Sequence, residues 1–311
     1  MSTALLTHPD CLKHVTPPGH PERVDRLMAI YAVLDTISDP ALVRHQAPMA
    51  RDEDILLAHP QRYIDRIKAA EPSEGTVALD ADTHMSPGSL NAAYRAVGGT
   101  VKAVDMVLDE EVQNAFAVVR PCGHHAETET PMGFCLFGNV AIAAKHALER
   151  HGLSRVAVVD FDVHHGNGTQ DLLWNEPRTL FVSSHQMPLY PGSGAVSERG
   201  ASNNVLNVPL QPHSDGSVFR TAYERIVFPA LEEYKPELIL VSAGFDAHAA
   251  DPLANLNLIE DDFAWVTERL CDIADAHAQG RVVSTLEGGY DLDALAASAA
   301  AHLNVLLKRG A

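Results

Sequence analysis

The segment Val156-Ala157-Val158-Val159-Asp160-Phe161-Asp162-Val163-His164-His165-Gly166-Asn167-Gly168 begins with four apolar residues and then becomes largely polar. Short runs rich in β-branched residues that end in polar or glycine-containing stretches are typical of strands buried inside a parallel sheet. Four further runs of this kind occur in the chain. We therefore predict strands at residues 116–119, 156–159, 179–182, 238–241 and 282–286.

Helical patterns lie between these runs, and several of them begin with Asp, Ser or Pro, which favour the start of a helix. They cover residues 22–35, 89–108, 139–150, 217–234, 261–278 and 292–308. This alternation predicts an α/β fold with a mainly parallel central sheet and helices on both faces. The chain of 311 residues is 46% hydrophobic and has no repeat or linker-like stretch, so we expect a single domain over residues 1–311.

The overall charge is strongly acidic, because 23 Lys and Arg stand against 41 Asp and Glu, which gives a formal net charge of -18. Such a surface repels phosphate backbones and anionic lipid headgroups, so direct binding of nucleic acid or membranes is not expected. The acidic surface either keeps the protein soluble or binds a basic partner. The first 15 residues lack the features of a signal peptide, and no apolar run approaches the roughly 18 residues of a membrane span. We expect a cytoplasmic protein, with a homo-oligomer as one option.

The four cysteines, Cys11, Cys122, Cys135 and Cys271, include no Cys-x-x-Cys pair. This pattern indicates neither a disulfide framework nor a thiolate zinc site, so we expect reduced thiols. For Cys122 and Cys135, which lie close to the polar motifs described below, we expect a role as small buried packing residues.

The quoted segment also carries candidate metal ligands. While the chain stays extended, the side-chain period of two places Asp160, Asp162 and His164 on one side, and carboxylate and neutral imidazole both bind divalent transition metals. The strand predicted at 238–241 leads to Asp246, which brings a further carboxylate to the same edge of the sheet. Two oxygen ligands and one nitrogen leave a position open for water or substrate, as in a catalytic zinc or iron(II) site. The alternative is that Asp160 and Asp162 only cap loops and helices, while the histidines are polar residues with satisfied hydrogen bonds at the edge of the sheet.

A second polar cluster, which contains His124 and His125, follows the strand predicted at 116–119. Adjacent imidazoles near a metal suggest proton handling, because the unperturbed pKa of histidine is about 6.5. Asp160 is available to orient one of the two rings and Asn167 to orient the other. Adjacent histidines also occur by chance in a chain with 17 of them, so the prediction of proton transfer rests on the position of the pair after a strand.

The strand predicted at 282–286 leads to Glu287-Gly288-Gly289-Tyr290, where paired glycines allow a tight turn that presents a tyrosine at the rim of the site. A tyrosine hydroxyl can stabilise the oxyanion that forms when activated water attacks an amide carbonyl. The alternative is an ordinary glycine turn with a tyrosine packed above it.

Taken together, these motifs resemble the histone deacetylase family. The resemblance rests on residues 120–127, 160–168, 242–248 and 287–290, which occur in the order of the family, and it extends to residues 20–23 and 189–194. It therefore covers nearly the whole chain. Asn167 stands where class I enzymes have aspartate, so the chain is most similar to the class II branch and its bacterial deacetylase-like amidohydrolase relatives.

The resemblance implies an arginase-like α/β fold and a deacetylase in which Asp162, His164 and Asp246 hold one Zn²⁺, with Fe²⁺ as the other candidate. It also implies a structural K⁺ near the backbone carbonyls of Asp160, Asp162 and His164 and near Ser183. Both cofactors are expectations from the family.

The same resemblance implies roles for the remaining polar residues. His124 would face Asp160 and His125 would face Asn167, and the two histidines would share the duties of general base and general acid, in a division left open. Tyr290 would stabilise the oxyanion.

The substrate-binding residues implied by the resemblance are Gly133, Phe134, Tyr190, Leu253 and Gly288. Aromatic walls at Phe134 and Tyr190 would form a narrow channel for an extended acyl-lysine, although many family members have phenylalanine at the position of Tyr190. Polyamine-deacetylating relatives place a glutamate at the rim, where this chain has Leu253, which favours acyl-lysine or an uncharged small amide over acetylpolyamine.

Three other functions stay open from the sequence. The first is an acetylpolyamine amidohydrolase. The second is a non-catalytic module that binds acyl-lysine or a partner protein, against which the full set of ligands, histidines and tyrosine argues. The third is a manganese ureohydrolase that resembles arginase, which needs more carboxylates for a two-metal site than these motifs provide.

Overall fold

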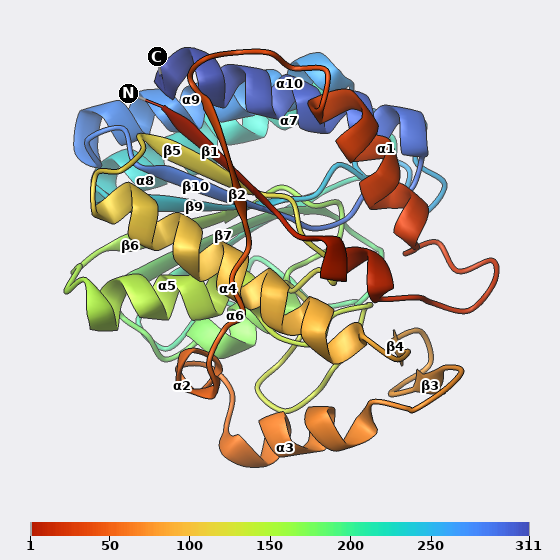
Figure 1. The fold of residues 1–311 in the computed structure, drawn as a ribbon. Helices are drawn as coiled ribbons and strands as arrows, with labels where there is room; N and C mark the ends of the chain where they lie inside the picture. The colour runs from red at the N-terminus through yellow and green to blue at the C-terminus, as the bar shows by residue number, and fades with distance from the viewer. Residues whose placement is uncertain (1, 311) are drawn as a thin grey trace.

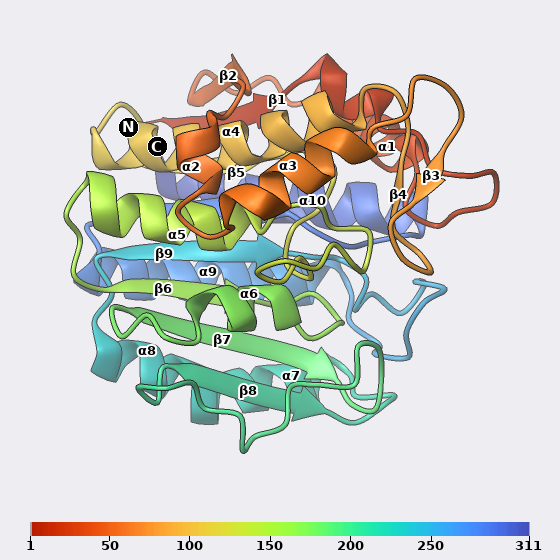
Figure 2. The same cartoon turned by 90° about the horizontal axis from the view of Figure 1, so that it is seen from below.

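The apolar runs predicted as strands form the middle of one parallel sheet. The computed structural model describes residues 2–310, and its main sheet has the strand order β2-β1-β5-β10-β9-β6-β7-β8, with every neighbouring pair parallel (Figures 1 and 2). A separate pair, β3 and β4, is antiparallel. The strands are β1 (Thr3–Thr7), β2 (Leu42–Gln46), β3 (Val77–Ala78), β4 (His84–Met85), β5 (Asn114–Ala117), β6 (Val156–Asp160), β7 (Thr179–Gln186), β8 (Val205–Leu210), β9 (Leu238–Ala243) and β10 (Val282–Leu286).

Helices cover both faces of the sheet, so the central strands are buried on both sides and read as continuous apolar runs. The helices are α1 (Val24–Leu34), α2 (Asp52–Ile55), α3 (Gln61–Ala70), α4 (Ser89–Leu108), α5 (Asn139–Arg150), α6 (Asn167–Leu173), α7 (Gly216–Ala222), α8 (Phe228–Tyr234), α9 (Glu260–His277) and α10 (Leu292–Gly310). In Figure 1, α1, α7, α9 and α10 lie above the sheet, and α4, α5 and α6 lie below it. A second apolar cluster joins α2 and α3 to α4 and α5.

The sequence predictions agree with this structure in the centre of the sheet and less well at its edges. The predicted helices at 89–108 and 139–150 match α4 and α5, and the predicted strand at 282–286 matches β10. The helix predicted at 217–234 is continuous but contains a π-helical turn at Tyr223–Val227 between α7 and α8. The strand predicted at 116–119 lies two residues too late, because β5 ends at Ala117.

All strands of the parallel sheet end at one side, where the long connections gather (Figure 2). In a sheet of this kind, side chains that follow the carboxyl ends of neighbouring strands come together. The predicted site residues lie at the end of β6 or after the strands β5, β6, β7, β9 and β10. The order of the central strands therefore determines which of these residues meet.

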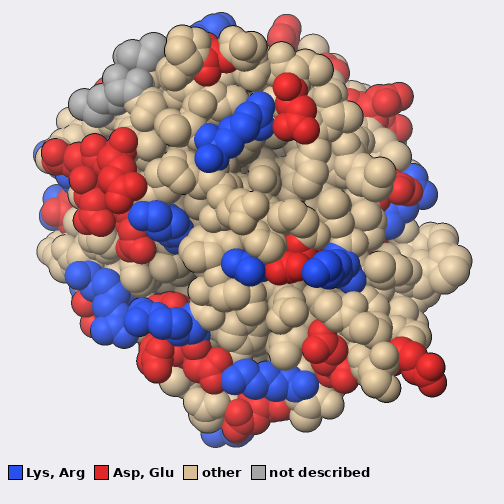
Figure 3. Space-filling model, in the orientation of Figure 1, with Lys and Arg blue, Asp and Glu red and all other residues tan. Residues whose placement is uncertain are grey.

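Two surface properties bear on possible partners. Across residues 2–310, no helix combines the length and the apolar character that crossing a membrane requires. On the face shown in Figure 3, Lys and Arg side chains lie among Asp and Glu side chains and form no continuous basic surface.

Candidate functional site

The three predicted metal ligands converge at the carboxyl edge of β6 and β9. These strands are parallel neighbours, with Asp160 paired to Ser242, so Asp162 and Asp246 emerge side by side. The Nδ1 atom of His164 lies 3.1 Å from Asp162 Oδ1 and 3.1 Å from Asp246 Oδ2. All three side chains are buried, and their ligand atoms lie within 4.8 Å of one another.

Backbone amides hold both carboxylates in place. Asp162 Oδ2 accepts a hydrogen bond from Gly288 N at 2.8 Å, and Asp246 Oδ1 accepts one from Val163 N at 2.8 Å. A side chain at Gly288 would overlap the carboxylates of Asp246 and Asp162, which explains why glycine is required there. Each carboxylate thus keeps one oxygen, Asp162 Oδ1 or Asp246 Oδ2, directed at His164.

The electrostatics of this cluster call for a cation. Burial raises the pKa of Asp246 to about 7, and the nearby charge of Asp162 adds to this rise. Burial acts against protonation of His164, but the two carboxylates more than offset it and raise the pKa of this imidazole to about 10. Two buried carboxylates that face one imidazole favour positive charge between them, which a proton on His164 or a bound cation supplies. Two oxygen atoms with one nitrogen suit Zn²⁺ or Fe²⁺. The donor set therefore fits the metal that the sequence predicts.

The histidine pair lies beside this cluster, and each ring has its own hydrogen-bond partner. Nδ1 of His124 lies 3.0 Å from Asp160 Oδ2, and Nδ1 of His125 lies 2.7 Å from Asn167 Oδ1. The ring centroids are 4.0 Å apart, and both rings are buried. This arrangement leaves Nε2 of both rings free of these partners and brings Nε2 of His124 to 3.8 Å from Asp162.

The two imidazoles have opposite electrostatic environments. Burial opposes the charged form of His124, but Asp162 and Asp160 overcome it and raise its pKa well above the ordinary value. Burial lowers the pKa of His125 well below the ordinary value, and the positive charge of His124 and His164 lowers it further. Environments that drive two neighbouring pKa values apart are typical of acid and base pairs in active sites.

Tyr290 is fixed by a turn whose backbone is held from two sides. Its N–H donates to Asp251 Oδ2 at 2.7 Å, and Arg26 donates to Gly289 O at 2.5 Å and to Glu287 O at 2.6 Å. The guanidinium of Arg26 also lies 4.8 Å from the centroid of the tyrosine ring. Burial raises the pKa of Tyr290 well above its ordinary value, so its hydroxyl stays protonated and can donate a hydrogen bond.

Several residues that support the site had no role predicted from the sequence. Arg26 forms an ion pair with Glu22, which also pairs with Arg120, and all three side chains are fully buried. Glu287 accepts hydrogen bonds from Gly123 N at 2.7 Å and from Ser242 Oγ at 3.0 Å, and so ties the histidine segment to β9. Glu22, Arg120 and Glu287 lie inside the motifs of the resemblance, but only the fold reveals their partners.

Two of the predicted channel residues are aromatic and flank the cluster. The ring of Phe134 lies 5.9 Å from that of Tyr290, and the ring of Tyr190 lies 5.2 Å from His125 and 6.2 Å from His164. Tyr190 is 39% exposed, so it lies at the mouth of the site. The aromatic side chains thus approach the histidines and the tyrosine from the solvent side.

The backbone around these rings is tightly constrained. Phe134 has a φ of 69°, an uncommon conformation for a residue with a side chain, and its N–H donates to Thr83 Oγ1 at 3.0 Å. Gly133 also has a positive φ, and a side chain there would overlap the ring of His125. Leu253 is half-buried, and its N–H donates to Asp251 Oδ1 at 3.0 Å, which connects it to the Tyr290 turn.

Cys122 and Cys135 are both buried, as predicted from the sequence, and they also contact each other. Their sulfur atoms are 3.3 Å apart, and both are free thiols. Cys135 Sγ also accepts a hydrogen bond from the His125 N–H at 3.4 Å. The pair therefore forms part of the packing behind the histidines.

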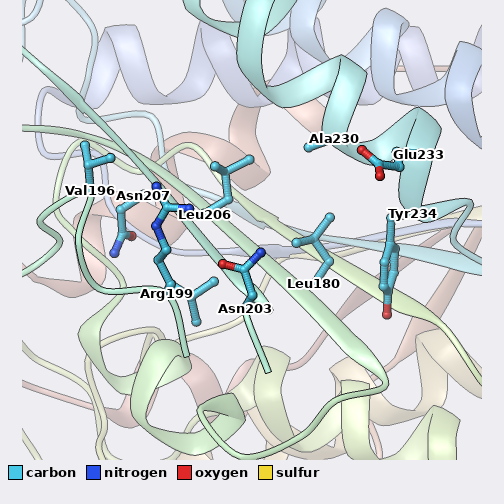
Figure 4. Close-up of a pocket in the computed structure, with 10 residues that line it drawn as sticks. Leu180, Val196, Arg199, Asn203, Leu206, Asn207, Ala230, Glu233 and Tyr234 are labelled. Carbon is cyan, nitrogen blue, oxygen red and sulfur yellow. The ribbon is translucent and has the colours of Figure 1, made fainter. Parts of the chain in front are cut away.

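A cavity of about 450 Å³ lies elsewhere, along the edge strand β8 (Figure 4). Leu180, Arg199, Leu206 and Tyr234 are among the residues that line it, and none of the predicted site residues does. Its lining contains no cluster of metal-binding or proton-transferring groups, so it does not compete with the carboxyl edge as the place for chemistry.

Comparisons with known proteins agree with this geometry. The family model of the histone deacetylase domain matches residues 20–306. A histone deacetylase-like amidohydrolase of Pseudomonas aeruginosa is 42% identical over 89% of this chain and 74% of its own, and a probable deacetylase of Archaeoglobus fulgidus is 36% identical over 94% and 82%. The crystal structure of the HDA15 HD domain matches with a TM-score of 0.93 and 32% identity, over 99% of this chain and 90% of the other. Since the family model spans every strand that carries the site and the fold agrees along the chain, this protein belongs to the histone deacetylase family.

Proposed function

We propose that this protein is a zinc-dependent deacetylase that removes acetyl or related acyl groups from lysine side chains or similar small amides. The observation that carries the proposal is the convergence of Asp162, His164 and Asp246 beside a buried histidine pair and a buried tyrosine. The relatives named as a deacetylase and as an amidohydrolase support the same reaction class. We further propose that residues 1–311 form one catalytic domain.

Asp162, His164 and Asp246 would hold the zinc ion. When bound, zinc acts as a Lewis acid that lowers the pKa of water and polarises a carbonyl group. A structural K⁺ is part of the proposal as well, near the carbonyls of Asp160, Asp162 and His164, because Ser183 of β7 pairs in register with Asp160 of β6.

The residues of the chain would then handle protons and charge. His124 and His125 would take a proton from the attacking water and deliver one to the leaving amine, while Asp160 and Asn167 keep Nδ1 of each ring engaged so that Nε2 faces the reaction. The Tyr290 hydroxyl would donate a hydrogen bond to the oxygen that becomes negatively charged. Its raised pKa keeps this proton in place at neutral pH.

The proposed substrate enters between Phe134 and Tyr190, whose rings suit the methylene chain of a lysine, while Gly133 and Gly288 leave room close to the reacting groups. Leu253 is an apolar side chain near the Tyr290 turn and offers no carboxylate for the distant ammonium group of a polyamine. We therefore propose acyl-lysine over acetylpolyamine. A cytoplasmic location and an acidic surface that suits basic protein substrates complete the proposal.

The test compares deacylation of acetyl-lysine and trifluoroacetyl-lysine peptides with that of acetylputrescine, on protein whose metal content has been counted. Tyr290→Phe is expected to lower kcat on the peptides by about 10²–10³-fold with little change in KM, because one oxyanion donor is lost. Tyr234→Phe is the matched control, since its hydroxyl bonds to Arg178 O far from the site, and it should keep wild-type activity.

The outcomes separate the candidate functions. Chelator-sensitive turnover of the peptides together with the loss in Tyr290→Phe supports the proposal. Turnover of acetylputrescine alone would replace it with a polyamine amidohydrolase. No turnover of any substrate by zinc-loaded protein would favour a module that binds acyl-lysine without hydrolysis.

A further inference from the structure

A second cluster of metal-binding side chains lies away from the catalytic edge, between α4 and α5. Asp105 Oδ1 lies 2.6 Å from His146 Nε2 and 2.8 Å from His151 Nε2. The two helices lie side by side in Figures 1 and 2. Because α5 ends only a few residues before β6 begins, this cluster lies at the amino ends of the strands, on the opposite side from the proposed active site.

One carboxylate oxygen brings the ligand atoms of this cluster together. Asp105 Oδ1 lies within hydrogen-bond distance of Nε2 of both imidazoles, and one ligand atom from each of the three side chains lies within 4.8 Å of the others. Asp109 Oδ1, 3.9 Å from His151 Nδ1, adds negative charge nearby. His151 and Asp105 are partly exposed, with side-chain exposures of 18% and 31%, so an ion can reach them from solvent.

Two imidazoles and one carboxylate are a preferred ligand set for Zn²⁺ and leave a fourth position for water. Ligand atoms around a tetrahedral zinc ion are about 3.3 Å apart, given metal–ligand bonds of about 2.0–2.1 Å. Asp105 Oδ1 and the two nitrogens would therefore have to separate by roughly 0.5–0.7 Å. Small rotations of the partly exposed Asp105 and His151 side chains can provide this while the buried His146 ring stays in place.

We propose that Asp105, His146 and His151 form a second metal site, for a divalent transition-metal ion of the zinc type, which links α4 to α5. It lies apart from the catalytic centre and does not depend on the proposed deacetylase function. The site has a practical consequence: two metal ions per chain would then signify two separate sites and not a two-metal catalytic centre.

The test counts zinc per chain after equilibrium dialysis against buffered Zn²⁺, by elemental analysis. The wild type should bind two, His151→Gln should bind one and keep its deacetylase activity, and Asp162→Asn should bind one and lose activity. His277→Gln is the matched control, because His277 pairs with Glu232 alone at 2.6 Å and its loss should leave two zinc ions bound.

A second readout does not involve activity. In the Asp162→Asn background, Zn²⁺ should raise the melting temperature, and adding Asp105→Asn or His151→Gln should abolish that rise, with circular dichroism showing that the variants are folded. One zinc per wild-type chain, two in His151→Gln, or a thermal shift that survives both substitutions would each overturn the second site. If the peptides are not hydrolysed but two zinc ions bind, the deacetylase proposal fails and this one stands.

Discussion

Replacing Arg26 with methionine should damage the protein in two measurable ways. Arg26 is fully buried and donates to the carbonyls of Gly289 and Glu287. These two carbonyls accept no other hydrogen bond from the described residues 2–310. Methionine fills similar space but cannot donate. Each buried carbonyl left without a partner costs about 1–3 kcal/mol, so Arg26→Met should lower the free energy of unfolding by about 2–6 kcal/mol. Glu22 keeps its pairing with Arg120, so no buried carboxylate is left alone.

The same substitution should lower kcat, because the tyrosine loses the contact that fixes its turn. A displacement of about 1 Å at a catalytic group can cost about 10²-fold in rate, so we expect a loss of about 10–100-fold. Zinc content should not change, since Arg26 contacts none of the proposed ligands. Urea unfolding followed by circular dichroism measures the first effect, and steady-state hydrolysis of an acetyl-lysine peptide measures the second.

A matched control is Arg62→Met, which removes a guanidinium paired with Glu129 at the surface and should change neither stability nor kcat measurably. If Arg26→Met unfolds at the same urea concentration as the wild type and keeps kcat within twofold, then the buried ion pair does not support the tyrosine. The carbonyls of Gly289 and Glu287 would then not need Arg26 as a donor.

Three further predictions concern the metal, pH and the thiols. Chelation should lower the melting temperature, because two buried carboxylates lose their cation, and zinc at 100 times its Kd should restore about 2.7 kcal/mol of stability. Burial lowers the pKa of His302 from 6.5 to about 3, so the unfolded chain binds a proton first as the pH falls below 6.5. Below pH 6.5, His302 should therefore lower the free energy of unfolding by about 1.4 kcal/mol for each pH unit. Urea unfolding measured between pH 7 and 5 should show that the free energy of unfolding falls less steeply with pH in His302→Gln, by that amount. All four cysteines are buried free thiols, so a thiol reagent should titrate four groups after unfolding and react far more slowly with the native protein, whereas rapid native reaction would contradict the burial.

The central part of the fold was predictable because strands that are buried on both faces consist of continuous apolar runs. Strand β6 is apolar along its first four residues and is followed by aspartates and histidines, whereas β9 leads to Asp246 and β10 leads to Tyr290. The edges of the sheet lack that pattern. Strand β2 has no buried residue, and β8 contains an asparagine and a proline, so neither forms the continuous apolar run that identified β5, β6, β7, β9 and β10. Strand β1, next to β2, was also not predicted.

The site was predictable only where its residues follow strands. Asp162, His164 and Asp246 lie at strand ends, and the parallel order of the sheet brings them together. Arg26 lies on a helix more than 250 residues away from the turn that it holds, and no local pattern distinguishes it from a surface arginine. The contact between Cys122 and Cys135 was equally hidden, because the tight turn from Met132 to Cys135 creates it.

The position of β10 has consequences for how the protein is made. Within residues 2–310 this strand comes after all other strands in sequence, yet it lies between β5 and β9 near the middle of the sheet. While residues 282–310 are still inside the ribosome, β5 and β9 each have an unpaired edge, and the nascent chain consists of two half-sheets that cannot join. A product that terminates early at this point would expose both apolar edges and be prone to aggregation, even though it contains every proposed zinc ligand. Synthesis of residues 282–310 is thus the step that closes the sheet and brings the tyrosine to the proposed metal ligands.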